Sequence, residues 1–274
     1  MKNFDLNLNK IIKCECSLGE GLFLNQKLAA WVDIDRNNIY LYKKNKFMKL
    51  KTKYKPSVIY EVKKDSVIYG SEVGIVILNI HNFQEKIISS FENAHDIKKY
   101  RSNDGCIFRE NKFLSFMHRD EPENNKGLIY LIKNGHSNLI DKEIYIPNSF
   151  IQLDKNNILI SDSYMSKVFI FRFDDSGKFI SKGIWNENLK MTPDGGCLIN
   201  DYIFITQWDK ACIAVYNLDG EIIQEVPLPV IRPTNCKFDK TNNQLWVTSA
   251  TNGLSIDKIK EYPQSGNTFI YDIY

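Results

Sequence analysis

Long apolar runs are missing from this sequence of 274 residues. No stretch approaches the roughly 20 consecutive apolar residues that a membrane-spanning helix needs, so we expect no membrane as a partner. The first 14 residues include lysines but neither a continuous apolar segment nor a cleavage site of small residues. The sequence therefore predicts no secretion signal, and we expect a cytoplasmic protein.

An excess of charge of one sign is lacking as well. The chain has 36 Lys and Arg against 33 Asp and Glu, which leaves a formal net charge of +3. This balance gives no electrostatic reason to expect nucleic acid as a partner. With 12% aromatic and 25% charged residues, the composition is that of a globular chain. The length suits a sizeable core, and we predict a single domain over residues 1–274.

Motifs of several familiar site classes are also absent. The six cysteines include Cys14 and Cys16, separated by one residue, but no second pair follows at zinc-finger spacing. We interpret the cysteines as free thiols, mostly buried, in a reducing compartment. The chain has neither the Gly-x-Ser-x-Gly turn of many serine hydrolases nor a phosphate-binding loop. A serine hydrolase is therefore not predicted.

Helical periodicity is scarce, and short strand-like runs take its place. Residues 158–160, 168–173 and 178–180 are such runs, and the turn Asp175-Ser176-Gly177 separates the last two. The same plan recurs over residues 112–140 and 202–223, and six such units of about four strands follow one another. This regular spacing predicts an all-β fold, a six-bladed β-propeller with four-stranded blades, rather than a two-sheet sandwich.

The sixth unit provides one strand too few for a complete blade. Residues 10–14 form a strand-like run ahead of the first unit and have no partner there. We predict that this N-terminal strand supplies the outer strand of the last blade and closes the ring. Closure removes the open sheet edge that would otherwise invite aggregation.

Short amide and carboxylate side chains recur in step with these units. Asn103, Asn148, Asp194 and Asn235 follow one another at intervals of 45, 46 and 41 residues. Each alone is typical of a turn or a cap, but their joint recurrence predicts a shared site at one end of the channel. With Glu20 of the first unit, Asn103, Asn148 and Asp194 offer only oxygen ligands and a formal charge of −2. Such a set favours Ca²⁺ first, with Mg²⁺ or Mn²⁺ next.

A set of motifs, in order along nearly the whole chain, resembles the SMP-30/gluconolactonase/LRE-like family of regucalcin and the sugar lactonases. The family is a six-bladed propeller, in agreement with the count of units. The motifs are Leu18-Gly19-Glu20-Gly21, Arg101-Ser102-Asn103-Asp104-Gly105, Ile146-Pro147-Asn148, Pro193-Asp194-Gly195, Pro227-Leu228-Pro229, Arg232-Pro233-Thr234-Asn235-Cys236 and Val247-Thr248-Ser249-Ala250.

The resemblance implies one divalent cation held by Glu20, Asn148 and Asp194. We expect Ca²⁺, with Mg²⁺, Mn²⁺ and Zn²⁺ as alternatives. The predicted function is a metal-dependent hydrolase that opens sugar lactones, such as gluconolactone, to aldonic acids. The cation would polarise the lactone carbonyl, and Asp194 would act as the general base. Because a carboxylate bound to a cation has a lowered pKa and is a weak base, direct activation of metal-bound water is the variant mechanism.

The resemblance also implies that Arg101 and Asn103 contact the substrate, a small-molecule sugar lactone. Asp120 lies where many relatives carry an acidic substrate contact, and Trp208 and Tyr164 are candidates for the channel mouth. His118, in contrast, is interpreted as a solvated loop residue.

This sequence departs from the family beside the predicted ligands, which leaves the choice of substrate open. Ser149 stands where the family usually has Gly, and Gly196 replaces a larger apolar residue.

Two other functions use the same residues. One is an esterase or phosphotriesterase-type hydrolase, because a metal site does not dictate the leaving group. The other is a non-catalytic calcium-binding propeller with a structural metal. The intact Arg101-Ser102-Asn103 favours an enzyme, since a structural cation needs no cationic substrate anchor.

Overall fold

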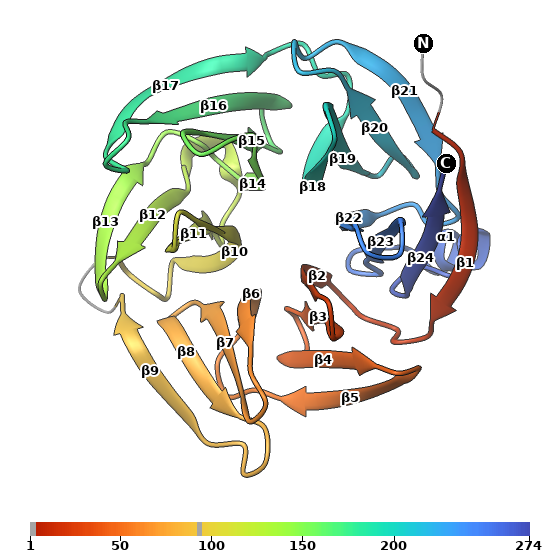
Figure 1. Cartoon of the computed structure of the whole chain (residues 1–274), viewed down its shortest axis with the longest axis horizontal. Coiled ribbons are helices and arrows are strands. Elements are labelled where there is room, and N and C mark those ends of the chain that lie inside the picture. Colours follow the sequence, from red (N-terminus) through yellow and green to blue (C-terminus); the bar gives the residue numbers. More distant parts are fainter. Residues whose placement is uncertain (1–3, 92–94) are drawn as a thin grey trace.

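Six antiparallel sheets are arranged in a ring around a central channel (Figure 1). The computed structural model describes residues 4–91 and 95–274. Each sheet has four strands, so the predicted six-bladed propeller with four-stranded blades is confirmed. We number the blades in chain order and begin with the sheet of β2 to β5.

The first three blades are each built from four consecutive strands. Blade 1 contains β2 (Gly19–Asn25), β3 (Leu28–Asp33), β4 (Asn38–Lys43) and β5 (Lys46–Lys51); blade 2 contains β6 (Pro56–Val62), β7 (Ser66–Ser71), β8 (Gly74–Asn79) and β9 (Glu85–Ser90); blade 3 contains β10 (Tyr100–Phe108), β11 (Asn111–His118), β12 (Leu128–Lys133) and β13 (His136–Asp141).

Blades 4 and 5 follow the same plan, and blade 6 combines the two ends of the chain. Blade 4 contains β14 (Pro147–Gln152), β15 (Asn157–Asp162), β16 (Lys167–Phe173) and β17 (Phe179–Asn186); blade 5 contains β18 (Thr192–Ile199), β19 (Tyr202–Trp208), β20 (Cys212–Tyr216) and β21 (Ile222–Pro227); blade 6 contains β22 (Pro233–Asp239), β23 (Gln244–Ser249), β24 (Thr268–Ile273) and β1 (Leu6–Ile12).

The N-terminal strand closes the ring as predicted. Strand β1 pairs antiparallel with β24, and the two ends of the chain lie on the same blade (Figure 1). The observed strand begins and ends earlier in the sequence than the predicted residues 10–14, since its pairing with β24 runs from Leu6 to Ile12. Beyond it, the N–H of Cys14 donates to the side-chain Oδ1 of Asn267 at 3.2 Å instead of to a neighbouring strand.

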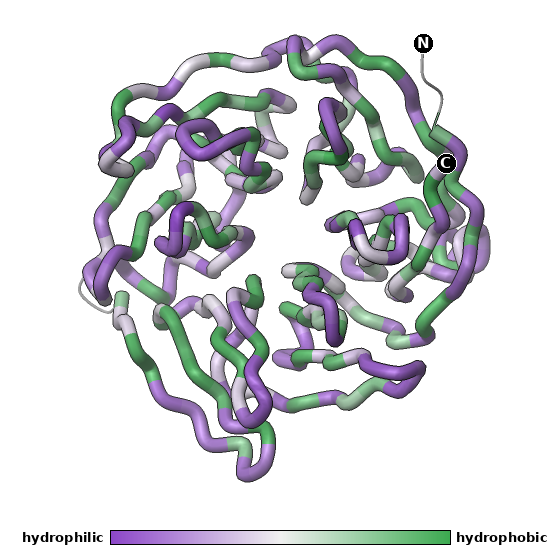
Figure 2. The backbone as a smooth tube through the Cα atoms, in the orientation of Figure 1, coloured by the Kyte–Doolittle hydropathy of each residue, from purple (hydrophilic) through white to green (hydrophobic). Residues whose placement is uncertain are grey.

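The apolar core lies between neighbouring blades rather than at the centre of the ring. Between blades 4 and 5, for example, Ile151, Leu159 and Val168 pack with Ile203 and Ile205. Alternating hydropathy along the strands, visible in Figure 2, directs apolar side chains to both blade interfaces. This arrangement leaves the inner strand ends free to carry polar residues.

Two elements are not among the strand-like runs of the sequence. The outer strand β5 of blade 1 exposes most of its side chains, so its sequence lacks a buried apolar pattern. A short helix, α1 (Ile256–Glu261), lies in the connection between β23 and β24 of blade 6. Ser255 is its N-cap, and the Ser255 side chain accepts a hydrogen bond from the N–H of Lys258. A short 3₁₀ turn, η1 (Pro122–Asn124), precedes β12. Over the described ranges, no helix is long and apolar enough to cross a membrane.

Candidate functional site

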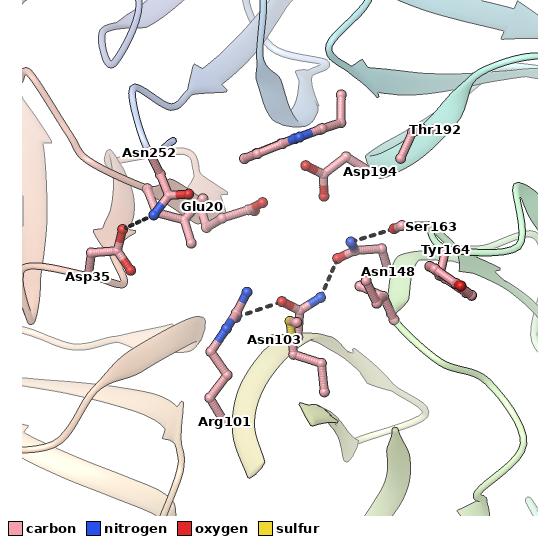
Figure 3. A pocket seen from close by; sticks show the side chains of 14 residues that line it. Glu20, Asp35, Arg101, Asn103, Asn148, Ser163, Tyr164, Thr192, Asp194 and Asn252 are labelled. Carbon is pink, nitrogen blue, oxygen red and sulfur yellow. Dashed lines mark hydrogen bonds between the residues drawn. The ribbon is translucent and has the colours of Figure 1, made fainter. Parts of the chain in front are cut away.

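A cavity of about 560 Å³ opens at one mouth of the channel and gathers most of the predicted site residues. Every inner strand begins at this end, because each blade of four antiparallel strands returns the chain to the same face. The side chains in Figure 3 project toward one another from blades 1, 3, 4 and 5. Those that the sequence predicted and the cavity brings together are Glu20, Arg101, Asn103, Asn148 and Asp194.

A break in strand pairing aims these side chains into the channel. The register of the inner strand shifts just after Glu20 in β2 and just after Asn148 in β14. In β10 and β18 the shift includes the site residue itself. Strand pairing stops one residue before Asn103 and one before Asp194, and it resumes two residues after each. A bulge of this kind turns a strand and re-aims the side chain at it. The recurrence in the sequence therefore reflects one repeated backbone device.

Residues with left-handed backbone make two of these bulges possible. Gly21, after Glu20, has φ = 57° and lies so close to the backbone of residue 57 that a side chain would not fit. Ser149, after Asn148, has φ = 53°, which explains why glycine is usual there. The Ser149 hydroxyl compensates by donating to the carbonyl of Asp194, and it accepts from Ser161 Oγ at 3.0 Å.

A chain of hydrogen bonds orders the polar side chains across three blades (Figure 3). Arg101 Nη1 donates to Asn103 Oδ1 at 2.7 Å, and Asn103 Nδ2 donates to Asn148 Oδ1 at 2.9 Å. Asn148 Nδ2 donates to Ser163 Oγ at 2.8 Å, and Ser163 Oγ donates to the carbonyl of Pro193 at 2.6 Å. The amide orientations are fixed by these partners. Among the residues that the structure describes, the Asn148 carbonyl oxygen accepts only the hydrogen bond from Asn103, which leaves its second lone pair for a further ligand.

Two aspartates hold the backbone that enters the inner strands. Asp33, at the end of β3, accepts hydrogen bonds from the amides of residues 17 and 18, at 3.0 and 3.2 Å. Asp162, at the end of β15, accepts from the amides of residues 145 and 146 in the same way, at 2.9 and 3.2 Å. These contacts fix the approach of the chain to Glu20 and to Asn148.

The carboxylates of the site are buried together, and this raises their pKa values. Burial is the main cause for Glu20, with the charge of Asp104 second, and its pKa rises to about 8. Burial also raises the pKa of Asp194 well above its usual range, and the charge of Glu20 adds to this effect. The guanidinium of Arg101 opposes both shifts but is too small a cause to cancel them. The site thus crowds acidic groups whose ionised forms lack a full counter-charge.

The residues present fit a hard divalent cation. Glu20 and Asp194 offer carboxylate oxygens that repel each other, and a cation would replace this repulsion with attraction. Asn235 lies beside them, with Nδ2 at 3.5 Å from Glu20 Oε2. Its buried Oδ1 has no hydrogen-bond partner among the described residues. Across residues 4–91 and 95–274 no group of three or more His, Cys, Asp and Glu is arranged for a metal. A cation here would therefore use amide oxygens as well as carboxylates.

Asp120 does not join the cavity. Its carboxylate is 79% exposed and lies 3.7 Å from Nδ1 of His118, in the connection that leads to β12. The structure also corrects the interpretation of His118, which ends β11 and is 8% exposed rather than solvated in a loop. Tyr164 and Trp208 do line the cavity, as proposed from the sequence.

Among the polar residues of the cavity wall that sequence reasoning missed are Asp35, Ser163 and Asn252. Asp35 Oδ2 accepts from Asn252 Nδ2 at 2.7 Å, which links blade 1 to blade 6 across the ring closure. All three lie just past the second strand of their blades, at the end where inner strands begin. A search of these connections for polar residues would have found them.

The fold and the site together define a class, the propellers that carry a polar cavity at the mouth of the central channel. The model of the SMP-30/Gluconolactonase/LRE-like region matches residues 18–251, and this chain belongs to that family. The resemblance predicted from the motifs is thereby confirmed.

Known proteins give the same result. Regucalcin of Xenopus laevis is 27% identical over 207 residues, which cover 69% of this chain and 68% of that protein. Regucalcin of Oryctolagus cuniculus is 26% identical and covers 73% and 72%. Among solved structures, the calcium-binding protein regucalcin from Agrobacterium tumefaciens superposes with a TM-score of 0.89 at 21% identity, covering 97% and 94%. A gluconolactonase from Xanthomonas campestris gives 0.71 at 14% identity, covering 95% and 87%. Family and fold support a lactonase-type function.

Proposed function

We propose that this protein is a metal-dependent lactonase that opens aldonolactones, such as gluconolactone, to aldonic acids. The observation that carries the proposal is the meeting of two buried carboxylates, two linked amides and an arginine in one cavity. The name of the Xanthomonas campestris neighbour, a gluconolactonase, supports the same substrate class.

Glu20, Asn148 and Asp194 would hold the cation. When bound, a divalent cation supplies Lewis-acid polarisation of the lactone carbonyl and stabilises the negative charge that develops on its oxygen. We favour Ca²⁺ because the donors are all hard oxygens and because a structural neighbour is named a calcium-binding protein. Mg²⁺, Mn²⁺ and Zn²⁺ are the alternatives.

Arg101 and Asn103 would bind and orient the sugar. Arg101 is half-buried, and its guanidinium donates to Oδ1 of Asn103, so both side chains enter the complex already ordered. The remaining N–H groups of the guanidinium suit sugar hydroxyls and the carbonyl oxygen of the lactone. Trp208 and Tyr164, on the cavity wall, offer faces for the apolar side of the ring.

Asp194 would move the proton. Its carboxylate accepts a proton from the water that attacks the carbonyl carbon, and it returns a proton to the ring oxygen when the ring C–O bond breaks. The chain then releases an aldonic acid, with one water consumed for each lactone opened. The fixed amide network beside Asp194 keeps the attacked carbon in register with this carboxylate.

A chelator experiment tests the proposal. Purified protein is assayed on a panel of aldonolactones, an aryl ester and a phosphotriester, before and after treatment with EDTA and after return of each cation. We expect aldonolactone opening that EDTA abolishes and a divalent cation restores. Faster turnover of the aryl ester or the phosphotriester would favour the broader hydrolase. Cation binding without turnover of any substrate would indicate a non-catalytic propeller.

A further inference from the structure

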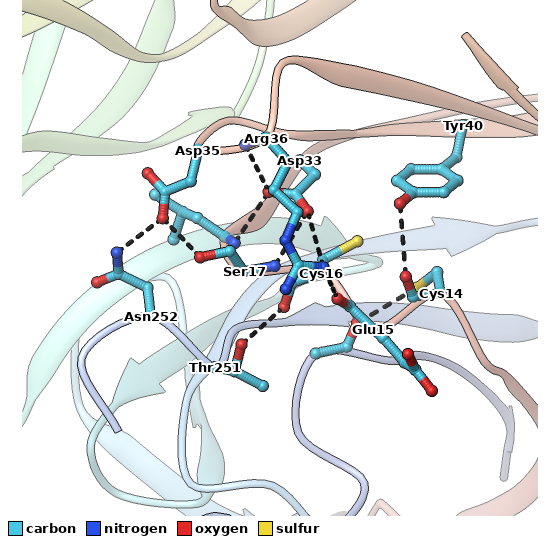
Figure 4. A network of polar contacts seen from close by, with 12 residues as sticks. Cys14, Glu15, Cys16, Ser17, Asp33, Asp35, Arg36, Tyr40, Thr251 and Asn252 are labelled. Atoms are coloured by element: carbon cyan, nitrogen blue, oxygen red, sulfur yellow. Dashed lines mark hydrogen bonds and ion pairs between the residues drawn. The ribbon is translucent and has the colours of Figure 1, made fainter. Parts of the chain in front are cut away.

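The connection between β1 and β2 carries two thiols that the catalytic proposal does not use. Cys14 is half-buried and Cys16 is 1% exposed, and a single residue separates them (Figure 4). Glu15, between them, has a left-handed backbone with φ = 51°. This local conformation is uncommon for a glutamate, so the surrounding structure must impose it.

Hydrogen bonds from blade 6 hold this bend in place. The N–H groups of Cys14 and Glu15 both donate to Oδ1 of Asn267, at 3.2 and 3.3 Å. The N–H of Cys16 donates to the carbonyl of Gly266 at 2.7 Å. A fully extended backbone would separate residues i and i+2 by about 7 Å, which is beyond the usual Cα–Cα span of a disulfide, at most ~6.8 Å. The bend at Glu15 therefore shortens the span between the two residues relative to an extended chain.

The surroundings of the two thiols provide one acceptor as well as donors, since Cys14 Sγ donates to the carbonyl of Gly266 at 3.3 Å. Cys14 Sγ lies 3.6 Å from the hydroxyl of Thr268. The indole N–H of Trp31 is fully buried and, within the described part of the chain, has no regular hydrogen-bond partner. It favours the thiolate form of both sulfurs, although for Cys16 the neighbouring Cys14 thiol and burial are larger causes and raise the pKa. Trp31 is held flat against the ring of Tyr40, whose hydroxyl donates to the carbonyl of Cys14 at 3.4 Å.

The two thiols differ in the way that a reacting and a resolving cysteine differ. The adjacent thiol of Cys16 lowers the pKa of Cys14, and this outweighs the opposing effect of burial. The adjacent thiol of Cys14 and burial raise the pKa of Cys16 well above its ordinary value. Cys14 is thus the better nucleophile and the more exposed, while Cys16 stays protonated behind it.

We propose that Cys14 and Cys16 form an oxidation site at which a hydroperoxide converts the pair to a disulfide. The Cys14 thiolate attacks the terminal peroxide oxygen, the O–O bond breaks, and an alcohol or water leaves after taking up a proton. Cys14 is then a sulfenic acid. The Cys16 sulfur attacks the Cys14 sulfur, the S–O bond breaks, and the hydroxyl leaves as water with the Cys16 proton. Two thiols and one hydroperoxide give one disulfide, one alcohol and one water.

The chain contains its own matched control in a second pair of cysteines. The sulfurs of Cys197 and Cys236 are 3.8 Å apart, but both residues lie in the core, 7% and 0% exposed. Proximity alone would predict oxidation of both pairs. Our proposal predicts that only the pair reached through Cys14 reacts in the folded protein.

The experiment titrates the folded full-length protein with hydrogen peroxide, blocks the remaining thiols and maps disulfides by mass spectrometry without reduction. We expect a Cys14–Cys16 link that forms about tenfold faster than oxidation of Cys106, the other half-buried thiol, and that dithiothreitol reverses. In Cys16→Ser, dimedone should trap Cys14 as its sulfenic acid, whereas Cys106→Ser should form the link normally. Because the wild-type map needs no variant, misfolding of a variant leaves the test intact. The proposal is overturned if Cys14 reacts no faster than Cys106, or if the Cys197–Cys236 link forms at the same rate.

Discussion

Asp194 and Glu20 share one cavity, yet the proposed chemistry gives them different duties. Both are buried carboxylates, and the charge of Glu20 adds to the burial that raises the pKa of Asp194. Glu20 acts only as a ligand and a source of negative charge. Asp194 also accepts a proton, which an amide in its place is unable to do at neutral pH.

Asp194→Asn should therefore reduce catalytic turnover more strongly than it reduces metal binding. The asparagine keeps an oxygen ligand, so at saturating cation the site should still fill. We expect kcat to fall by about 10²–10⁴, the usual contribution of a general base. Lactone opening is measured beside cation occupancy, which is determined directly by calorimetry or elemental analysis.

Glu20→Gln is the matched comparison for this substitution. It removes one carboxylate of the same cavity and should weaken cation affinity, with kcat largely restored at saturating cation. Should Asp194→Asn with its metal site full open lactones at the wild-type rate, Asp194 would be a ligand only, and the assignment of the general base would be wrong.

The burial of His95 should affect the stability of the folded protein at acid pH. Its ring lies 4.2 Å from that of Phe116 and 5.6 Å from that of Tyr130, measured between centroids. Burial in this aromatic setting lowers the pKa of His95 to about 4, despite the opposing charge of Asp96. The unfolded chain binds this proton at about pH 6.5. The contribution to stability is therefore complete above pH 6.5 and is lost as the pH falls toward 4.

We expect His95→Phe to reduce the loss of stability between pH 7.5 and pH 5. Phenylalanine fills the same aromatic site but takes up no proton in the unfolded chain. The measurement is the urea midpoint at the two pH values for wild type, for His95→Phe and for His136→Phe, which replaces an exposed histidine. An equal midpoint shift in wild type and His95→Phe would show that His95 does not contribute.

Among the elements, the bulged inner strands connect sequence to site most directly. In β18 the residue Gly196, where the family usually carries a larger side chain, closes the bulge that presents Asp194. A Cβ at Gly196 would overlap the carbonyl oxygen of Phe204 and lie 2.8 Å from Cδ1 of Ile151. Ile151 of blade 4 and the backbone of β19 therefore pack directly against Gly196, where there is no room for a side chain.

Gly196→Ala should consequently destabilise the protein by about 1–3 kcal/mol, the usual range for overpacking a filled core. The first obstacle is backbone, which has little freedom to move within the paired strands β18 and β19. Urea unfolding measures the effect, with Asp201→Ala, in the exposed turn of the same hairpin, as the control. A Gly196→Ala protein as stable as the control would mean that the bulge adjusts freely.

At the scale of the whole molecule, stability depends on closing the ring. The sheet of blade 6 joins residues from both ends of the chain, with Leu6 paired to Ile273 and Ile12 to Thr268. Phe4 extends this closure, since its ring packs edge-on at 5.0 Å against those of Tyr202 and Phe204 in blade 5. Removing the strand would expose an apolar interface and leave a row of backbone groups on β24 without their hydrogen-bond partners.

Deletion of residues 1–12 should lower the melting temperature of the entire domain. We expect a decrease on the order of 10 °C, because several kcal/mol are lost and each corresponds to ~2–4 °C in a domain of this size. Calorimetry or circular dichroism measures it, and deletion of residues 1–3 alone is the control. A truncated protein that melts like the full chain would show that closure by this strand does not contribute to stability.

Local patterns in the sequence were enough to predict the architecture. Runs such as 168–173 alternate and are separated by turns that contain Gly or Asp, so the strands and their count follow from backbone and side-chain preferences over a few residues. The recurrence of Asn103, Asn148 and Asp194 follows for the same reason, because each inner strand repeats one bulge. Glu20 belongs to the same series once the blade is aligned.

Contacts between residues far apart in the sequence determined the rest. Asp35 and Asn252 meet only because blade 6 closes onto blade 1, and no local pattern encodes that distance. Asp120 falls outside the cavity because its loop turns to solvent, although its place in the sequence predicted a substrate contact. Cys14 and Cys16 depend on Asn267 and Gly266 for their bend. The sequence by itself determined which strands form and which side chains each inner strand presents. The tertiary structure alone decided burial, charge crowding and the partners of each polar group, because these depend on the packing of blades that are distant in the chain.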